Sequence, residues 1–240
     1  MSTPTELPTR LEFIPMQAAP VDAEATVRSD TIHIRWVMPE IFQDIPLHEE
    51  DEDETVRLLE ELAQRALPGA EPEDQLKLAI FVALGIDDLL AGRAEYAALC
   101  VGAVGADPCT ATVFTTLVDS PDAEDDDVIA AISSSLRREG LGEVAEIQLP
   151  CGPAVSCVGS REDKVSSDLT ESPDGLTLPT SFIRVYLPLP NLTTVVMEMS
   201  TPTPVGWDTF STIFGNVVSS IRLFTSDGAP LIVPDRDTDA

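Results

Sequence analysis

Residues 181–224 read SFIRVYLPLPNLTTVVMEMSTPTPVGWDTFSTIFGNVVSSIRLF, and the elements that this segment predicts set the architecture of the chain. Residues 182–187 and 195–199 are apolar runs rich in β-branched side chains, which is typical of strands. The prolines and the asparagine of residues 188–191 predict a short turn between two antiparallel strands. In the second strand we expect Met197 to face the core and Glu198 to face solvent, because successive side chains point to opposite faces.

The segment after the second strand predicts an amphipathic helix over residues 204–224. Its large apolar residues recur every three or four positions and so share one helical face. They are Trp207, Phe210, Phe214, Val217, Ile221 and Phe224. Thr203 followed by Pro204 is typical of an N-cap with proline in the first turn, where the missing N–H has no helical partner anyway. A helix with one apolar stripe must cover another element, and we expect this helix to cover a sheet.

Shorter patterns place the other elements. We expect an irregular arm over residues 1–30, a first strand over 31–37, helices over 54–67 and 73–90, a hairpin of strands 96–102 and 110–118, a helix over 125–138, strands over 144–149 and 154–159, a polar loop over 161–179 and a tail over 225–240. The apolar face of the first of these helices should carry Val56, Leu59, Leu62 and Ala63.

These elements predict an α+β fold in which an antiparallel β-sheet is sandwiched by helices, with an added N-terminal helix pair. One domain over residues 31–224, with a helical insertion at about 54–91, is the simplest division, because neither a repeat nor a linker interrupts the pattern. A domain of this size can bury roughly 70–75% of its unfolded-chain surface. Its core therefore needs neither disulfides nor a structural metal ion.

The predicted helix over residues 73–90 is nearly apolar between 76 and 84. Such a helix is either buried on several sides or lies against a partner. If its side chains stay exposed, they form a surface on which another protein can bind. The residues that we single out for this partner surface are Leu76, Ile80, Phe81 and Leu84, together with the acidic residues Glu49, Glu50, Asp51, Asp125, Asp126 and Asp127.

The formal net charge is −28 at pH 7, from 42 acidic and 14 basic side chains. This charge repels phosphates and anionic lipids, so nucleic-acid and membrane partners are disfavoured. The acid is densest in residues 49–54 and 122–127, which we expect to form a solvated loop and a helix N-terminus, where carboxylates complement the helix dipole. Neither run has the D-x-D-x-D-G spacing of a calcium-binding EF-hand. Attraction to a basic protein partner remains open.

The four cysteines are Cys100, Cys109, Cys151 and Cys157. They form no C-x-x-C pair, so we expect free thiols, and Cys100 lies in an apolar strand pattern, where we expect a buried thiol. Residues 1–10 lack the basic start and the apolar run of a signal peptide. No apolar stretch reaches the roughly 20 residues that span a bilayer. We therefore expect a cytoplasmic protein.

Candidates for catalysis are few. The histidines are His33 and His48, and neither has a second histidine or a cysteine at metal-ligand spacing. A dyad of His33 with Cys151 or Cys157 would need neighbouring strands and positive charge nearby, which is scarce in an acidic chain. G-x-S-x-G, Walker and G-x-G-x-x-G motifs are missing from the sequence. We therefore predict no catalytic residue, no cofactor and no metal ion.

Two short motifs each precede a predicted strand, LPCGPAV at residues 149–155 and YLPLP at residues 186–190. With the order of elements and the final helix after a Thr-Pro turn, they make the chain resemble bacterial proteins with a Mog1/PsbP-like fold, over residues 31–224. The relatives include photosystem assembly factors, a Ran-binding protein, bacterial lipoproteins and Eag-type chaperones that shield apolar segments of secreted effectors. The resemblance implies binding to other proteins, by analogy of fold and without a shared catalytic residue.

Three functional hypotheses follow from the sequence. The preferred one is a non-catalytic binding or adaptor protein, of chaperone or assembly-factor type, whose partner has basic or apolar exposed segments. The second is an enzyme, or a small-ligand or metal-binding protein, with an unrecognised site in an apolar pocket. The third is a self-assembling structural component that uses residues 76–84 as its oligomer face. If the apolar side chains of the helix over residues 73–90 are buried within the chain, this helix is part of the scaffold. If they are exposed beside an open groove, the helix is a candidate binding surface.

Overall fold

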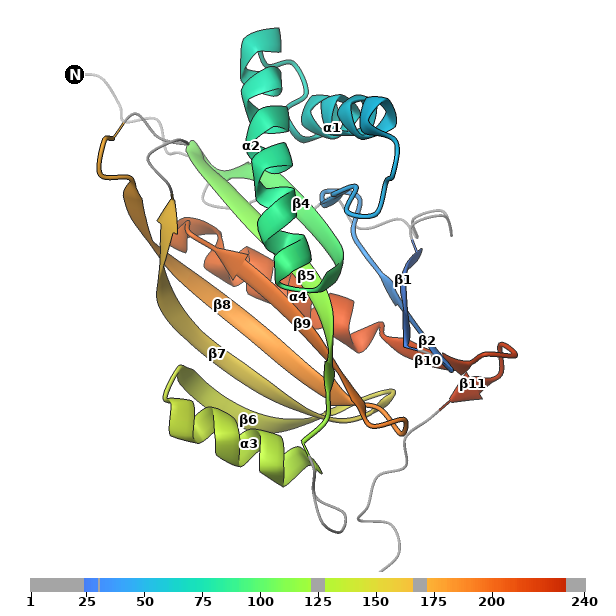
Figure 1. Cartoon of the computed structure of the whole chain (residues 1–240). Coiled ribbons are helices and arrows are strands. Elements are labelled where there is room, and N and C mark those ends of the chain that lie inside the picture. The colour runs from blue at the N-terminus through green and yellow to red at the C-terminus, as the bar shows by residue number, and fades with distance from the viewer. Residues whose placement is uncertain (1–23, 30, 122–127, 166–171, 232–240) are drawn as a thin grey trace, which may run out of the picture.

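The computed structural model describes residues 24–29, 31–121, 128–165 and 172–231 (Figure 1). Within these residues the protein is α+β, with four α-helices and two antiparallel sheets. The finer assignment to a Mog1/PsbP-like fold stays a prediction.

The helices are α1 (Glu52–Ala66), α2 (Pro72–Ala91), α3 (Val128–Glu139) and α4 (Trp207–Ser219). The strands are β1 (Glu24–Ser29), β2 (Ile32–Val37), β3 (Gln43–Asp44), β4 (Ala94–Val104), β5 (Asp107–Asp119), β6 (Gly142–Leu149), β7 (Gly152–Val165), β8 (Leu176–Pro188), β9 (Thr193–Thr201), β10 (Arg222–Thr225) and β11 (Pro230–Leu231). The helix pair, the β4–β5 hairpin and the strands β6 to β9 confirm the elements that their sequence patterns predict.

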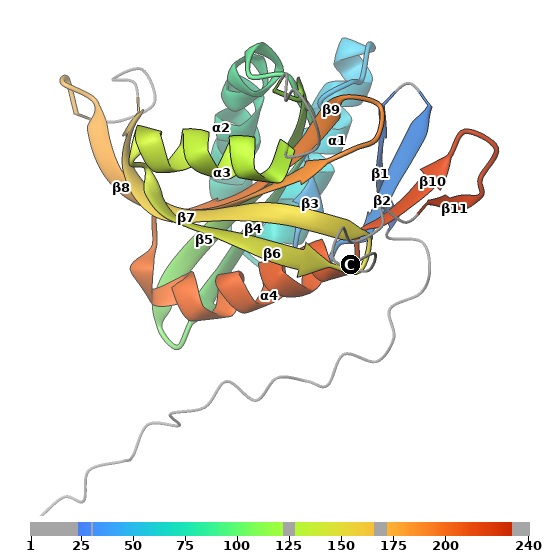
Figure 2. The same ribbon diagram turned by 90° about the horizontal axis from the view of Figure 1, so that it is seen from below.

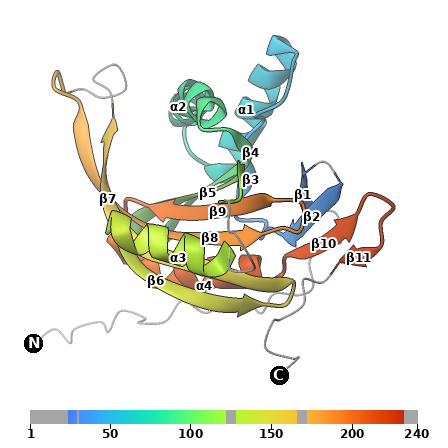
Figure 3. The ribbon, with the colours of Figure 1, turned by 60° about the horizontal axis from the view of Figure 1, so that its bottom comes forward.

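The larger sheet has seven strands in the order β3-β4-β5-β9-β8-β7-β6, all antiparallel to their neighbours. Helices α2 and α3 lie on one face of this sheet, and α4 lies on the other face (Figures 2 and 3). We call the face that carries α2 and α3 the front face. Met197 and Met199 of β9 point to the α4 face and pack in the main core with Phe214.

The smaller sheet has the strand order β1-β2-β10-β11 and overturns two predictions about the ends of the chain. Residues 24–29 form β1, in which Val27 pairs with Ile34, so this part of the predicted arm is not irregular. The alternation of exposed Thr26 and Arg28 with buried Val27 has the period of a strand. Part of the predicted tail is likewise a strand, because β11 pairs with β10. Residues 1–23 and 232–240 lie outside the described residues.

Helix α4 ends at Ser219, five residues earlier than predicted. Ile221 and Leu223, two positions apart, are both buried, and β10 pairs with β2. The burial of side chains after Ser219 therefore follows the two-residue period of a strand and not the period of a helix. As predicted, Pro204 begins the short 3₁₀ turn Pro204–Gly206 that leads into α4 and the residue before it is the N-cap, but the hydroxyl of this N-cap residue, Thr203, makes no capping hydrogen bond. Its Oγ1 instead accepts a 3.0 Å hydrogen bond from the backbone N–H of Thr110 and so ties the start of the helix to β5.

The predicted polar loop over residues 161–179 is wrong at both of its ends. Strand β7 continues to Val165, and β8 begins at Leu176, which pairs with it. Together they form a two-stranded ribbon that projects beyond the sheet (Figures 1 and 3). Because the ribbon is paired through its backbone, it needs few apolar side chains, and its polar sequence therefore looks like a loop. Residues 166–171 lie outside the described residues.

Buried apolar residues form three clusters. The largest lies between the seven-stranded sheet, α4 and β2, the second between the α1–α2 pair and β4, and the third between α3, β7 and β8. In α1, Leu59, Leu62 and Ala63 are buried as predicted, whereas Val56 is 56% exposed. The two clusters on the front face fix α2 and α3 on either side of the central strands.

Candidate protein-binding groove

Helix α2 contacts the rest of the protein through only part of its surface. Ala79 and Val82 are buried against α1 and β4, whereas the apolar side chains on its other faces are exposed. The exposed fractions are 53% for Leu76, 51% for Ile80, 51% for Phe81 and 54% for Leu84. All four apolar residues that the sequence proposes for a partner surface are therefore accessible.

A cavity of about 510 Å³ opens beside α2, and we call it the α2 groove. Phe81 and Leu84 of α2 line one side, and Val165 of the β7–β8 ribbon lines another. Leu76 and Ile80 are exposed but lie outside the lining. The remaining lining residues are Ile45, Val82, Gly85, Asp88, Leu89, Leu99, Thr112, Asp163 and Lys164. The groove is therefore largely apolar and lies between a helix and a projecting ribbon.

The lining of the α2 groove also includes two acidic residues from different elements, Asp88 of α2 and Asp163 of β7. Lys164 contributes one positive charge. The carboxylate of Asp163 accepts a 2.8 Å hydrogen bond from Nε of Arg161, and this contact orients it. An apolar group with a cation beside it would match both the lining and its carboxylates.

Arg161 belongs to an ionic network on the front face that is centred on Glu198 of β9. Nη1 of Arg161 donates a 2.6 Å hydrogen bond to Oε1 of Glu198, and Nε of Arg184 donates one of 2.6 Å to Oε2. The Glu198 side chain has no exposed surface. The prediction that Glu198 faces solvent is therefore wrong, because the long side chains of Arg161 and Arg184, from the two neighbouring strands, cover its carboxylate on the front face.

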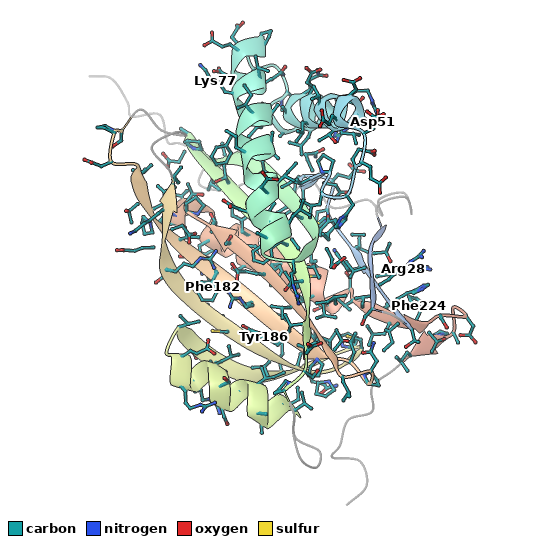
Figure 4. All side chains as sticks on the ribbon, viewed as in Figure 1. Arg28, Asp51, Lys77, Phe182, Tyr186 and Phe224 are labelled. Carbon is teal, nitrogen blue, oxygen red and sulfur yellow. The ribbon has the colours of Figure 1, made fainter. Side chains whose placement is uncertain are left out.

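The network continues to Tyr186, whose hydroxyl accepts a 3.1 Å hydrogen bond from Nη1 of Arg184. The guanidinium carbons of Arg161 and Arg184 each lie 5.4 Å from the centre of the Phe182 ring. Phe182 and Tyr186 lie along β8 (Figure 4). The chain of contacts Asp163–Arg161–Glu198–Arg184–Tyr186 thus runs across three neighbouring strands.

The environment of these groups shifts their pKa values. Burial lowers the pKa of Arg161, but its hydrogen bond and ion pair with Glu198 outweigh this and raise the pKa above its ordinary value. The pKa of Arg184 is also raised, because the hydrogen bond to Tyr186 and the charge of Glu198 outweigh burial. Burial raises the pKa of Tyr186, although Arg184 opposes the shift. The arginines stay charged and the tyrosine stays protonated at neutral pH.

A second cavity, of about 390 Å³, lies at the other end of the front face, and we call it the α3 pocket. Val118 of β5 and Leu136 of α3 contribute apolar walls. Tyr186 lines it too, so the ionic network joins residues of both cavities. The other lining residues are Asp119, Pro121, Ala131, Ile132, Ser135, Glu139 and Thr194.

Sequence reasoning missed the ionic network. The sequence feature that could have revealed the network is Glu198, a single carboxylate inside the apolar run VVMEM. A charge in such a run is costly unless it is paired, and Arg161 and Arg184 lie on the two strands beyond it. Their pairing depends on the strand order β9-β8-β7, which the residue pattern does not specify.

The acidic residues of the predicted partner surface lie apart from the groove. Glu49, Glu50 and Asp51 are exposed before α1, and Asp51 caps that helix by accepting hydrogen bonds from the N–H groups of Asp53 and Glu54 at 3.0 and 3.3 Å. Asp51 lies on the opposite side of the helix pair from the β7–β8 ribbon (Figure 4). This run is therefore a helix N-terminus, as the simpler interpretation expects. Asp125, Asp126 and Asp127 lie outside the described residues.

The structure does not bring together the residues of the hypothetical dyad. His33 is on β2 in the smaller sheet and pairs with Phe224 of β10. Cys151 is buried in the main core, whereas Cys157 is buried under α3. Burial raises the pKa of Cys151 to about 11 and also raises that of Cys157, so neither thiol is activated as a nucleophile.

All four cysteines are unpaired, as the sequence predicts, and all four are buried, which the sequence predicts for Cys100 alone. Nε2 of His48 lies 3.2 Å from the backbone carbonyl oxygen of Glu95. No group of three histidine, cysteine or acidic side chains arranged for a metal ion occurs in the part of the chain that the structure describes. In that same part, none of the helices combines the length and the apolar character that crossing a membrane requires.

Comparison with known proteins finds no protein-family model and no curated protein that matches this sequence.

Proposed function

We propose that this protein is a non-catalytic binding protein, of adaptor or chaperone type, that takes an apolar segment of another protein into the α2 groove. The observation that carries this proposal is the position of Phe81 and Leu84, which stay half exposed beside a cavity of about 510 Å³. Soluble proteins rarely leave adjoining large apolar side chains uncovered unless another surface covers them. A polypeptide segment with its own apolar side chains would cover these residues and fill the groove.

The charges of the groove indicate the character of that segment. Asp88 and Asp163 add two carboxylates to an apolar lining that holds one lysine, and the formal net charge of the chain is −28. A partner with lysine or arginine beside its apolar residues is attracted by this field and pairs with the groove carboxylates. A second copy of the chain carries the same negative charge and is repelled, so self-assembly through α2 is disfavoured.

Two further points support the proposal. The resemblance to Mog1/PsbP-like proteins implies partners that are proteins, although this is an analogy of fold. The four unpaired thiols fit a reducing compartment. We therefore propose that the partner is a cytoplasmic protein or a protein that passes through the cytoplasm.

Photocrosslinking in cells of the protein's own species tests the proposal. A photoreactive amino acid replaces Leu84 in the groove in one variant and Val56 in a matched control. Val56 is an apolar residue of α1 with 56% exposure that does not line the groove. We expect adducts that are specific to position 84 and whose crosslinked peptides contain apolar residues next to lysine or arginine.

Size-exclusion chromatography with light scattering completes this experiment. The proposal expects a monomer for the purified protein. Identical adducts from positions 84 and 56, or adducts of position 84 with other copies of the same chain, would contradict it.

A further inference from the structure

We infer that the segment bound by this protein is an α-helix that lies over β5 and β9, between α2 and α3, with a basic side chain in the α3 pocket. The inference rests on the proposed function and adds the conformation of the partner, its position and a second point of contact. Four features of the front face carry it: the strand order, the arrangement of α2 and α3, the distance between the two cavities, and the charges of the α3 pocket.

The strand order favours a helix over an extended segment. Strands β5 and β9 are interior strands, paired to β4 and β8 on their outer sides, so no free edge faces the region between α2 and α3. An extended segment lying there would find no strand with which to pair its backbone N–H and C=O groups. A helix pairs these groups within itself and presents only side chains to the sheet.

The arrangement of helices on the front face leaves a place for this partner helix. Helix α2 packs mainly on β4, and α3 packs mainly on β6 and β7. Figure 1 shows the two helices at different parts of the same face, with the central strands between them. A partner helix here would contact both helices and the half-buried side chains of Phe114 and Thr116.

The distance between the cavities sets the length of the partner helix. Thr112 of β5 lines the α2 groove, and Val118 of the same strand lines the α3 pocket. Their positions differ by six, an even number, so both side chains face the front. At about 3.3 Å per residue the two cavities are about 20 Å apart. An α-helix spans this distance in about 13 residues, because it rises 1.5 Å per residue.

The α3 pocket is suited to a lysine or arginine side chain. Its walls include Val118 and Leu136, against which an aliphatic stem can pack, and its acidic groups are Asp119 and Glu139. Long basic side chains bury their stems along apolar surface while their charge reaches a polar partner. The Tyr186 hydroxyl is already hydrogen-bonded by Arg184, which leaves the two carboxylates to pair with the incoming charge.

A displayed library of random 20-residue peptides tests the inference. Peptides are selected on the full-length wild-type protein, and those that also bind the Phe81→Ser/Leu84→Ser variant are discarded. We expect the selected peptides to carry apolar residues every three or four positions and a lysine or arginine about 13 residues from an apolar residue near the other end. Circular dichroism should show that a synthetic copy of the leading peptide becomes helical when bound.

The α3 pocket is then tested with the leading peptide. The Asp119→Asn/Glu139→Gln variant should bind it about tenfold more weakly, with a smaller dependence on salt. Replacing the distal basic residue of the peptide by glutamine should cause the same loss on the wild type and no further loss on the variant. Both substituted positions are on the surface, so the melting temperature serves as the control for folding.

The outcomes separate the two proposals. If the selection yields no peptide that depends on Phe81 and Leu84, both the proposed function and this inference are wrong. If groove-dependent peptides are selected but bind in an extended form, or bind equally well to the Asp119→Asn/Glu139→Gln variant, only the inference is overturned.

Discussion

Nε of Arg184 lies 2.6 Å from Oε2 of Glu198, and these two residues are direct partners across the β8–β9 pair. Because Glu198 is fully buried, its charge must be balanced within the protein. Arg161 provides the second cation from β7. A single carboxylate therefore connects three adjacent strands of the sheet, in the part of the front face that lies between α2 and α3.

The first prediction concerns this carboxylate. Glu198→Gln keeps the shape of the side chain but leaves two arginines without their shared negative charge, so the free energy of unfolding should fall by about 3 kcal/mol. A double-mutant cycle of Glu198→Gln with Arg184→Met, measured by urea unfolding, should give a coupling energy above about 1 kcal/mol. Glu73 and Lys77 of α2 form the matched control, since this ion pair is 2.8 Å long but well exposed, and its coupling should stay below about 0.5 kcal/mol.

The second prediction concerns Leu192 in the turn between β8 and β9. Its φ angle is +63°, in the left-handed region that disfavours a branched side chain, and its side chain is 76% exposed. Leu192→Gly removes this strain without loss of packing and should raise the free energy of unfolding by about 0.5–1 kcal/mol. Leu192→Ala keeps the strain and should have little effect. A gain of the same size in both variants would show that the exposed side chain, and not the backbone angle, is responsible.

The third prediction concerns the close approach of β6 and β7 at Gly159. A Cβ atom at this position would lie 2.2 Å from the backbone oxygen of Leu141 and 3.0 Å from Cζ of Phe182. Gly159→Ala should therefore lower the free energy of unfolding by about 2 kcal/mol through a shift of the backbone. Gly102→Ala in β4 is the control, because its added Cβ meets no atom within 4 Å. Equal stability of the two variants would contradict the tight packing of this edge.

The fourth prediction concerns pH. Burial raises the pKa of Cys100 and Cys151 from 9.0 to about 11. The unfolded chain therefore loses these thiol protons at lower pH than the folded protein does. The stability that this difference contributes is complete below pH 9 and is lost as the pH rises through about 11. Urea unfolding at several pH values should show this decline, and Cys100→Ala/Cys151→Ala should reduce its slope.

The same burial makes the thiols slow to react. In the native protein at neutral pH, Ellman's reagent should modify Cys100 and Cys151 far more slowly than after unfolding, because they are protonated and covered. Fast modification of all four cysteines in the native protein would contradict the core as described.

The sequence patterns predict the elements well where one periodicity persists over many residues. Helices α1 and α2 and the β4–β5 hairpin lie within a few residues of the predicted positions. Prediction fails where two patterns overlap. Phe224 continues the spacing of the α4 stripe, but Ile221 and Leu223 also fit a strand, and pairing with β2 decides in favour of the strand.

The candidate site is predictable only in part, for a physical reason. Leu76, Ile80, Phe81 and Leu84 stand out because they put apolar side chains on several faces of one helix, which must then be buried on several sides or lie against a partner. Whether they are covered depends on packing that involves distant residues, such as Val165 of the β7–β8 ribbon. Glu198 is misassigned for the same reason, since alternation places it opposite Met197 but does not reveal that arginines of the two neighbouring strands cover it.

Amide hydrogen exchange with and without the leading selected peptide tests the central claim most directly. We predict that the peptide increases protection in the part of α2 that contains Phe81 and Leu84, in the β7 end of the ribbon and along β5, while β1, β2 and β10 are unchanged. Protection confined to the smaller sheet or to the acidic segment before α1, with α2 unaffected, would contradict the assignment of the α2 groove as the binding site.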